Sequence, residues 1–170
     1  MAEAFAAAVR ARKADVQVID LANVACEPAD GRPLEKYDRS IQDAVHAVIQ
    51  AQAVVIASPV YRATYAGVLK NFLDITPIEA LRDKPVGLAV LGGSQHHYLG
   101  VDNALRAVLA WFGALALPNS VYLVGSDFTE QRQPNDKAKG ELDALAGAIV
   151  TLGERLAATP LGPVPLAARY

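Results

Sequence analysis

The sequence lacks the features that mark disulfide-rich, nucleic-acid-binding and disordered proteins. Its 170 residues include one cysteine, Cys26, which alone can form neither a disulfide framework nor a CxxC site. Lysine and arginine total 16 against 18 aspartates and glutamates, so no positive excess indicates contact with nucleic acid. Hydrophobic residues make up 52%, which is too many for a disordered chain. We therefore expect a folded protein in a reducing, cytoplasmic setting.

No targeting or membrane-spanning segment is predicted. The N-terminus has no basic stretch ahead of its short apolar part, as a secretory signal would have. The longest uncharged run, residues 107–126, is long enough to raise the question of a membrane span. Pro118 and Asn119 interrupt it, so we interpret it as helix, turn and strand, and expect no membrane partner.

The length corresponds to a single domain that is large enough to bury its own core. We expect one domain over residues 1–158, followed by a C-terminal tail over residues 159–170. The tail contains three prolines, so an extended or loose course over the surface is predicted for it.

Apolar periodicity predicts helices and strands in strict alternation. Helices are expected over residues 2–13, from Ser40 onward, and over 64–75, 100–112 and 136–158; strands are expected over 16–21, 53–57, 86–91 and 121–124. The run at 53–57 is continuously apolar, which is typical of a parallel strand covered on both faces. The alternation predicts an α/β, doubly wound parallel sheet. Residues 22–39 form a long predicted loop, either a functional lid or a mobile segment.

In open parallel sheets, ligands bind beyond the carboxyl ends of the strands. Two predicted loops at this edge follow neighbouring strands and contain our candidate site residues: Ser58, Pro59, Val60, Tyr61, Arg62, Gly92, Gly93, Ser94 and His96. Pro59 stiffens the first loop, while Tyr61 offers an aromatic surface and Arg62 a cation. The paired glycines of the second loop let the backbone approach a flat ligand closely.

Other interpretations of these two loops are an ordinary turn, or a metal, hydrolase or nucleotide site whose sequence motif is absent. Each loop taken alone is also typical of an ordinary turn. His96 and His97 are adjacent and do not form the HExxH zinc pattern, and Ser94 lacks the GxSxG setting of a hydrolase nucleophile. The sequence contains neither GxGxxG nor the P-loop pattern, so neither type of nucleotide fingerprint is present.

Two stretches carry a resemblance to a known family. Residues 58–74, SPVYRATYAGVLKNFLD, resemble the P-x-Y-x-x-x-Y-x-G-x-L-K-x-x-L-D segment of NADPH-dependent FMN reductases. The similarity is to the branch that supplies reduced flavin to sulfonate-type monooxygenases. Residues 92–94 and 101–109 resemble the glycine loop and the V-D-x-A-L-[KR]-x-V-L helix of that branch. The resemblance extends over about residues 14–158.

The resemblance implies a flavodoxin-like fold with strand order 2-1-3-4-5 and FMN at the carboxyl edge. It implies that Ser58 to Arg62 hold the ribityl chain and the ring edge, and that Gly92, Gly93, Ser94 and His96 face the isoalloxazine. The reaction would be hydride transfer from NADPH or NADH to flavin N5. Homodimers or tetramers, with the helix of residues 65–74 near the interface, and a partner monooxygenase are implied as well. A quinone or azo-type reductase, and a non-catalytic flavin-binding relic, remain as alternatives.

The sequence departs from the family pattern at two places. Asn103 stands where the sulfonate branch often has an aromatic residue that modulates flavin exchange, so that mechanism does not carry over. Family members also begin with a strand and a Gly/Ser/Arg-rich phosphate loop, whereas Met1 lies almost at the first predicted helix. We therefore expect an N-terminally shortened form that lacks the central first strand and its loop.

Overall fold

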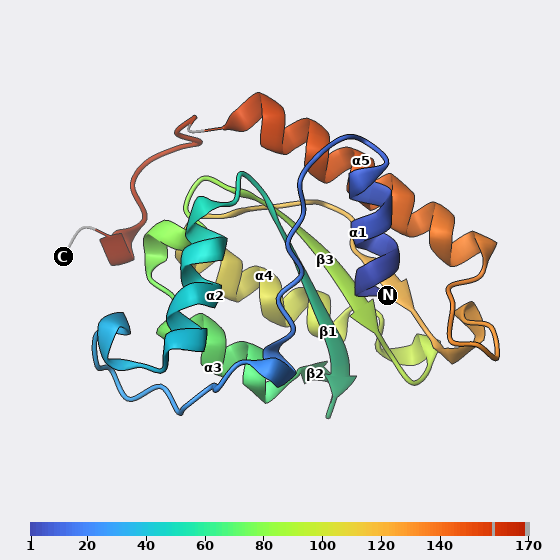
Figure 1. The fold of residues 1–170 in the computed structure, drawn as a ribbon, viewed down its shortest axis with the longest axis horizontal. Coiled ribbons are helices and arrows are strands. Elements are labelled where there is room, and N and C mark those ends of the chain that lie inside the picture. The colour runs from blue at the N-terminus through green and yellow to red at the C-terminus, as the bar shows by residue number, and fades with distance from the viewer. Residues whose placement is uncertain (158, 169–170) are drawn as a thin grey trace.

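The computed structural model describes residues 1–157 and 159–168 and shows a mostly parallel sheet with helices on both faces (Figure 1). The helices are α1 Ala2–Arg10, α2 Arg39–Gln50, α3 Gly67–Ile75, α4 Gly100–Phe112 and α5 Asp136–Leu156. The strands are β1 Val54–Tyr61, β2 Thr64–Tyr65, β3 Pro85–Leu91, β4 Leu115–Ala116 and β5 Val121–Leu123. The predicted α/β class is confirmed, as are the helix at 100–112 and, within one residue, the strands at 86–91 and 121–124.

The centre of the sheet is the parallel pair β1 and β3, whose register runs from Val54 opposite Val86 to Pro59 opposite Leu91. The short strands β4 and β5 both pair in parallel with β3. The remaining strand, β2, returns antiparallel along the end of β1. As a result, the carboxyl ends of β1 and β3 lie next to each other.

The two faces of β3 meet different helices, because successive side chains of a strand point in opposite directions. Leu88 belongs to the cluster of buried residues that includes Leu105 of α4, while Ala89 belongs to the cluster that includes Leu145 of α5. A Cβ on Gly87 would meet the Leu145 side chain at 2.9 Å, so α5 packs closely against the strand there. Helix α1 packs against α5 on the same face.

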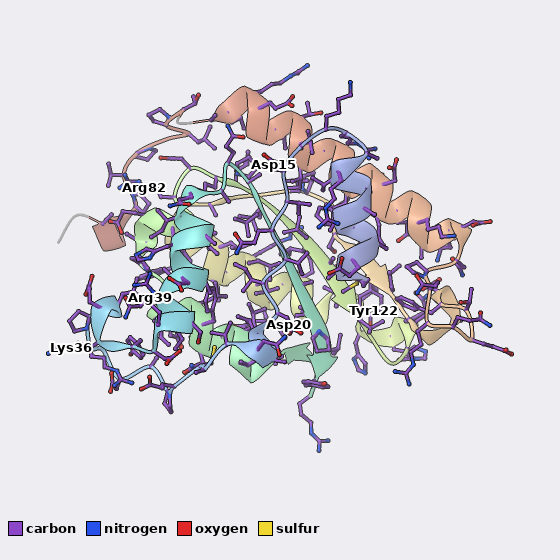
Figure 2. The ribbon with its side chains drawn as sticks, in the orientation of Figure 1. Asp15, Asp20, Lys36, Arg39, Arg82 and Tyr122 are labelled. Carbon is purple, nitrogen blue, oxygen red and sulfur yellow. The ribbon has the colours of Figure 1, made fainter. Side chains whose placement is uncertain are left out.

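The predicted strand at residues 16–21 is wrong. The segment runs between opposite ends of the sheet, where Asp15 and Asp20 are labelled (Figure 2), and Val16 is partly buried, as the apolar pattern indicated. No strand among the described residues pairs with it. On the side of β1 that faces away from β3, the only strand of the described residues that pairs with β1 is β2, at Val60 and Tyr61. A strand needs hydrogen bonds to a neighbour, which an apolar pattern does not supply.

One predicted helix start is also wrong: Thr64 belongs to β2, and α3 begins only at Gly67. Helix α2 begins at Arg39, within one residue of the predicted start at Ser40. Its cap is Asp38, whose carboxylate accepts a hydrogen bond from the Ser40 amide at 2.8 Å.

The C-terminal tail packs on the domain over part of its length. Its Leu161 amide donates to the Asp83 carboxylate at 3.0 Å, and a Cβ on Gly113 would meet Pro165 at 2.5 Å. The predicted end of the last helix at Ala158 lies outside the described residues, as does the end of the tail at residues 169–170.

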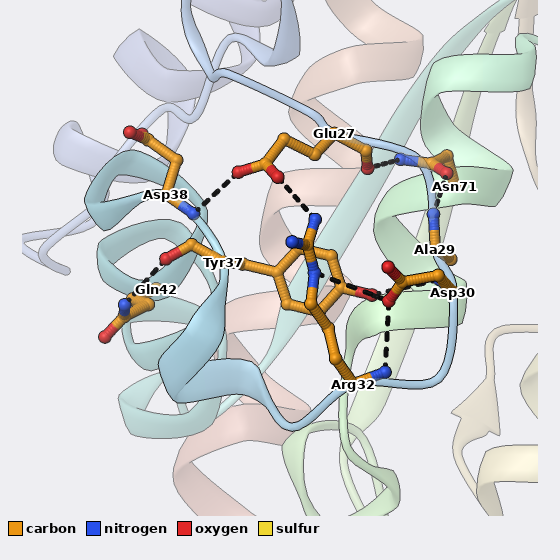
Figure 3. Close-up of polar contacts among 8 residues, drawn as sticks. All are labelled: Glu27, Ala29, Asp30, Arg32, Tyr37, Asp38, Gln42 and Asn71. Carbon is orange, nitrogen blue, oxygen red and sulfur yellow. Dashed lines mark hydrogen bonds and ion pairs between the residues drawn. The ribbon is translucent and has the colours of Figure 1, made fainter.

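The segment predicted as a loop over residues 22–39 ends at Asp38, the cap of α2, and a network of polar contacts holds it (Figure 3). The Arg32 guanidinium lies 4.2 Å from the centroid of the Tyr37 ring and forms an ion pair with Glu27. Asn71 of α3 donates to the Glu27 carbonyl at 2.8 Å and accepts from the Ala29 amide at 2.9 Å. These contacts attach the loop to α3.

None of the helices in the described ranges is both long enough and apolar enough to cross a membrane.

A bidentate ion pair joins Arg12, in the turn that follows α1, to α5 and predicts a pH dependence. The Arg12 guanidinium donates to both Asp143 carboxylate oxygens, at 2.7 and 2.8 Å, and thereby lowers the pKa of that carboxyl. Because the pKa of Asp143 is lower in the folded state, the ion pair stabilises the protein at pH values above the unfolded pKa of about 3.9. This stabilisation is lost as the pH falls through the folded-state pKa.

We expect Asp143→Asn to lower the urea midpoint of unfolding near neutral pH and to match the parent in strong acid. Glu154→Gln, which removes a carboxylate with no ion pair among the described residues, is the control. A constant difference at all pH values would contradict the prediction.

Candidate functional site

The two predicted site segments lie side by side at the carboxyl edge of the sheet. β1 continues beyond the predicted strand, so Ser58 to Tyr61 are strand residues and the prediction of a loop there is wrong. Only Arg62 and Ala63 form the turn to β2. Because Pro59 pairs with Leu91, this end of β1 adjoins the start of the glycine loop, as the sequence predicted.

Ser58 is 2% exposed, and its hydroxyl serves the local fold. The hydroxyl donates to the Pro59 carbonyl at 2.9 Å and accepts from the Ala66 amide at 3.0 Å. Ala66 is the residue that precedes α3. The side chain of Ser58 therefore holds the hairpin against the start of α3.

The hairpin turn has an unusual backbone. Arg62 and Ala63 have φ angles of 52° and 65°, a left-handed region that favours glycine and costs energy for other residues. The Ala63 carbonyl oxygen lies only 2.6 Å from where a Cβ of Gly100 would stand, so the turn packs against the start of α4. Tyr61 is 63% exposed beside it, and Arg62 forms no ion pair with any described residue.

The glycine loop presents free backbone donors. Gly92 is buried, and its amide donates to the Leu123 carbonyl at 2.8 Å. Gly93 is exposed, and the space where its Cβ would stand is open. The amides of Gly93 and Ser94 have no acceptor among the described residues. These amides are therefore free to donate hydrogen bonds to a ligand that carries acceptor atoms.

His96 lies in the short helix Gln95–His97 that follows the glycine loop, and both of its histidines are exposed. Within the described ranges, no three histidine, cysteine or acidic side chains gather in a way that could hold a metal ion.

Sequence reasoning missed two residues that shape this edge. Tyr122 donates a hydrogen bond to the Ser94 carbonyl at 2.7 Å, and Gly100 allows the hairpin turn to approach α4. The only sequence signal for Tyr122 is a hydroxyl within an otherwise apolar strand, and Gly100 carries none.

The residues at this edge suit a planar ligand with polar ring atoms. Unpaired amides fit ring carbonyl oxygens, the exposed ring of Tyr61 offers a flat apolar contact, and Arg62 supplies positive charge. The fold that carries this edge, a mostly parallel sheet with helices on both faces, is flavodoxin-like. An archaeal flavodoxin shares the fold, with a TM-score of 0.63 over 91% of this chain and 87% of that one, at 15% identity.

Comparison with known proteins defines the family. The model of the NADPH-dependent FMN reductase family matches residues 1–129, which is most of the chain, so this protein belongs to that family.

Individual relatives agree with the family assignment. The NAD(P)H-dependent FAD/FMN reductase of Geobacillus thermodenitrificans is 34% identical over 119 residues, or 70% of this chain. This match spans 64% of the length of the Geobacillus protein. The NADH-dependent FMN reductase SfnF of Pseudomonas fluorescens is 33% identical over 76% of this chain and 69% of its own. The apo structure of the NADH:FMN oxidoreductase EMOB is 31% identical and covers 94% of this chain and 82% of its own, with a TM-score of 0.74.

Proposed function

We propose that this protein is an NAD(P)H-dependent FMN reductase that supplies reduced flavin to a partner monooxygenase. The observation that carries the proposal is the pair of unpaired amides, at Gly93 and Ser94, beside the shared end of β1 and β3. Membership of the FMN reductase family supports it, and so do the activities for which the Geobacillus and Pseudomonas relatives are named.

In this proposal the backbone does most of the binding. The amides of Gly93 and Ser94 donate to acceptor atoms on the edge of the flavin ring, and the absence of a side chain at Gly93 leaves room for the ring. Tyr61 contacts the flavin through its exposed ring, and Arg62 brings a positive charge toward the bound nucleotide. Bound FMN would supply the chemistry of accepting a hydride from NADPH or NADH.

The titratable side chains at this edge are compatible with such a reaction. Tyr61, Arg62, His96 and His97 are exposed, so any proton that accompanies the hydride is available from solvent. Hydride transfer depends on the alignment of two rings more than on a side-chain acid. The residues therefore act by orientation and by hydrogen bonding to the ring.

The proposal extends to assembly and location. Large apolar side chains are exposed near the hairpin and α3, namely Tyr61, Val68, Tyr98 and Leu99. They give apolar surface through which a homodimer or tetramer would form. We place the protein in the cytoplasm, where reduced nicotinamide nucleotides and a partner monooxygenase would meet it.

Flavin titration of the purified chain tests the proposal. We expect quenching of FMN fluorescence on binding and oxidation of NADPH or NADH that depends on added FMN. Gly93→Val fills the open space above the loop, so we expect FMN affinity to fall by about tenfold or more. Gly162→Val makes the same change at an open glycine of the tail and serves as the control. A chain that neither binds FMN nor oxidises either nucleotide would disprove the proposal.

A second candidate is an azo-type or quinone reductase on the same fold. The FMN-dependent NADPH-azoreductase of Staphylococcus saprophyticus is 28% identical over 118 residues, which favours keeping this alternative. Steady-state rates with free FMN, a quinone and an azo dye as acceptors separate the two. A faster rate with the dye or the quinone than with FMN would favour the alternative.

A further inference from the structure

Tyr122 connects the sheet to the glycine loop. It lies on β5 opposite Val90 of β3, and its side chain packs partly buried against the cluster between the sheet and α4. Figure 2 shows it at the end of the sheet where β3 ends. Its hydroxyl donates to the Ser94 carbonyl oxygen at 2.7 Å. A side chain of one strand thus holds the loop that follows the neighbouring strand.

The same side chain explains why Gly92 is a glycine. A Cβ at Gly92 would stand 1.8 Å from the Tyr122 hydroxyl oxygen and 2.4 Å from the ring carbon that bears it. The tyrosine ring therefore occupies the space that any other side chain at position 92 would need. The glycine and the tyrosine form a matched pair at the base of the loop.

The hydrogen bond to Ser94 also determines where the next amide points. The Ser94 carbonyl and the Gln95 N–H belong to one planar trans peptide, so they point in opposite directions. Since the carbonyl points toward Tyr122, the Gln95 N–H points away from it. Gln95 is the first residue of the helix Gln95–His97, where an amide has no acceptor within the helix. No other described residue accepts from it.

We propose that Tyr122 is a positioning residue that holds the glycine loop so that the Gln95 amide, together with those of Gly93 and Ser94, donates to the flavin. This inference rests on the proposed function and adds two residues to it. Gln95 contributes through its backbone N–H, and its side chain is not required. Tyr122 acts only through the Ser94 carbonyl.

Removing the hydroxyl tests the role of Tyr122. In Tyr122→Phe without ligand, we expect amide NMR shifts to change at residues 92–97 and protection of the Gly92 amide to fall. FMN affinity should fall about threefold to tenfold, which is the effect of losing one hydrogen bond. The KM for FMN should rise while kcat stays nearly unchanged. Tyr37→Phe removes a comparable hydroxyl, bonded to Asp30 in the distant loop, and is the control. Unchanged amide shifts at residues 92–97 in Tyr122→Phe would overturn the proposal.

Gln95→Pro tests the amide directly, because proline has no N–H. Ser94 has φ −154° and ψ 166°, a conformation that a following proline favours, so the loop should keep its shape. We expect FMN affinity to fall about threefold to tenfold while the Gly92 amide stays protected. Gln95→Ala, which keeps the N–H, should bind FMN as the parent does. Equal affinity of Gln95→Pro and Gln95→Ala would overturn the role of the amide.

The amide shifts of ligand-free Tyr122→Phe test whether Tyr122 positions the loop even if the parent chain does not bind FMN. The positioning proposal and the proposed function can therefore fail separately.

Discussion

Replacing Gly92 by alanine is expected to lower the free energy of unfolding by about 1–3 kcal/mol, the usual effect of overpacking a well-filled interior. The new Cβ would stand 1.8 Å from the Tyr122 hydroxyl oxygen, so either the ring or the loop must move. If the loop moves, the hydrogen bond from the Gly92 amide to Leu123 is strained, and the amides of the site lose their alignment. Weaker FMN binding should therefore accompany the loss of stability.

Urea unfolding of a double-mutant cycle measures this coupling. In the background of Tyr122→Val, which removes the ring, Gly92→Ala should cost less than about 0.5 kcal/mol, because contacting residues are not additive. Gly93→Ala, whose Cβ would meet no heavy atom within 4 Å, is the matched control in the parent background. If Gly92→Ala costs the same with and without the Tyr122 ring, the explanation by steric overlap is wrong.

Replacing Gly100 by alanine is expected to destabilise the protein, although glycine to alanine usually stabilises a helix. The Cβ would stand 2.6 Å from the Ala63 carbonyl oxygen, a backbone atom that moves only with the whole hairpin turn. We expect a loss of about 1–3 kcal/mol. The hairpin carries Tyr61 and Arg62, so its displacement should weaken FMN binding as well.

Gly140→Ala in α5 is the matched control for Gly100→Ala. A Cβ on Gly140 would meet no heavy atom within 4 Å, so the usual helix effect should appear there as a gain of about 0.5–1 kcal/mol. The two substitutions should shift the urea midpoint in opposite directions. A gain in stability for Gly100→Ala would contradict the close packing of the turn against α4.

Local sequence patterns were sufficient to predict those elements whose own apolar residues are buried in the core. The stripe of α4 and the continuous apolar run of β3 predicted both elements within one residue, because each pattern reports burial directly. The alternation of strands and helices then predicted the doubly wound class, and with it the edge where the glycine loop lies. These features follow from composition and order along the chain.

Elements that depend on a distant partner could not be predicted in this way. Residues 16–21 have the apolar content of a strand, yet no described strand pairs with them. The local sequence predicts a loop at Ser58 to Tyr61, but hydrogen bonds to β3 and β2 extend β1 through these residues. Pairing is a property of two segments, and one segment's sequence does not contain it.

The order of residues along the chain was sufficient to predict the fold class, the position of the glycines at the carboxyl edge and the resemblance to the FMN reductases. How those glycines are used depends on contacts that form only in the folded protein. The space beside Gly92 is occupied by the Tyr122 ring, Gly93 faces open space, and Gly100 lies against the hairpin turn. The physical reason is that a glycine's role depends on which atoms approach its missing side chain, and those atoms come from residues far away in the chain.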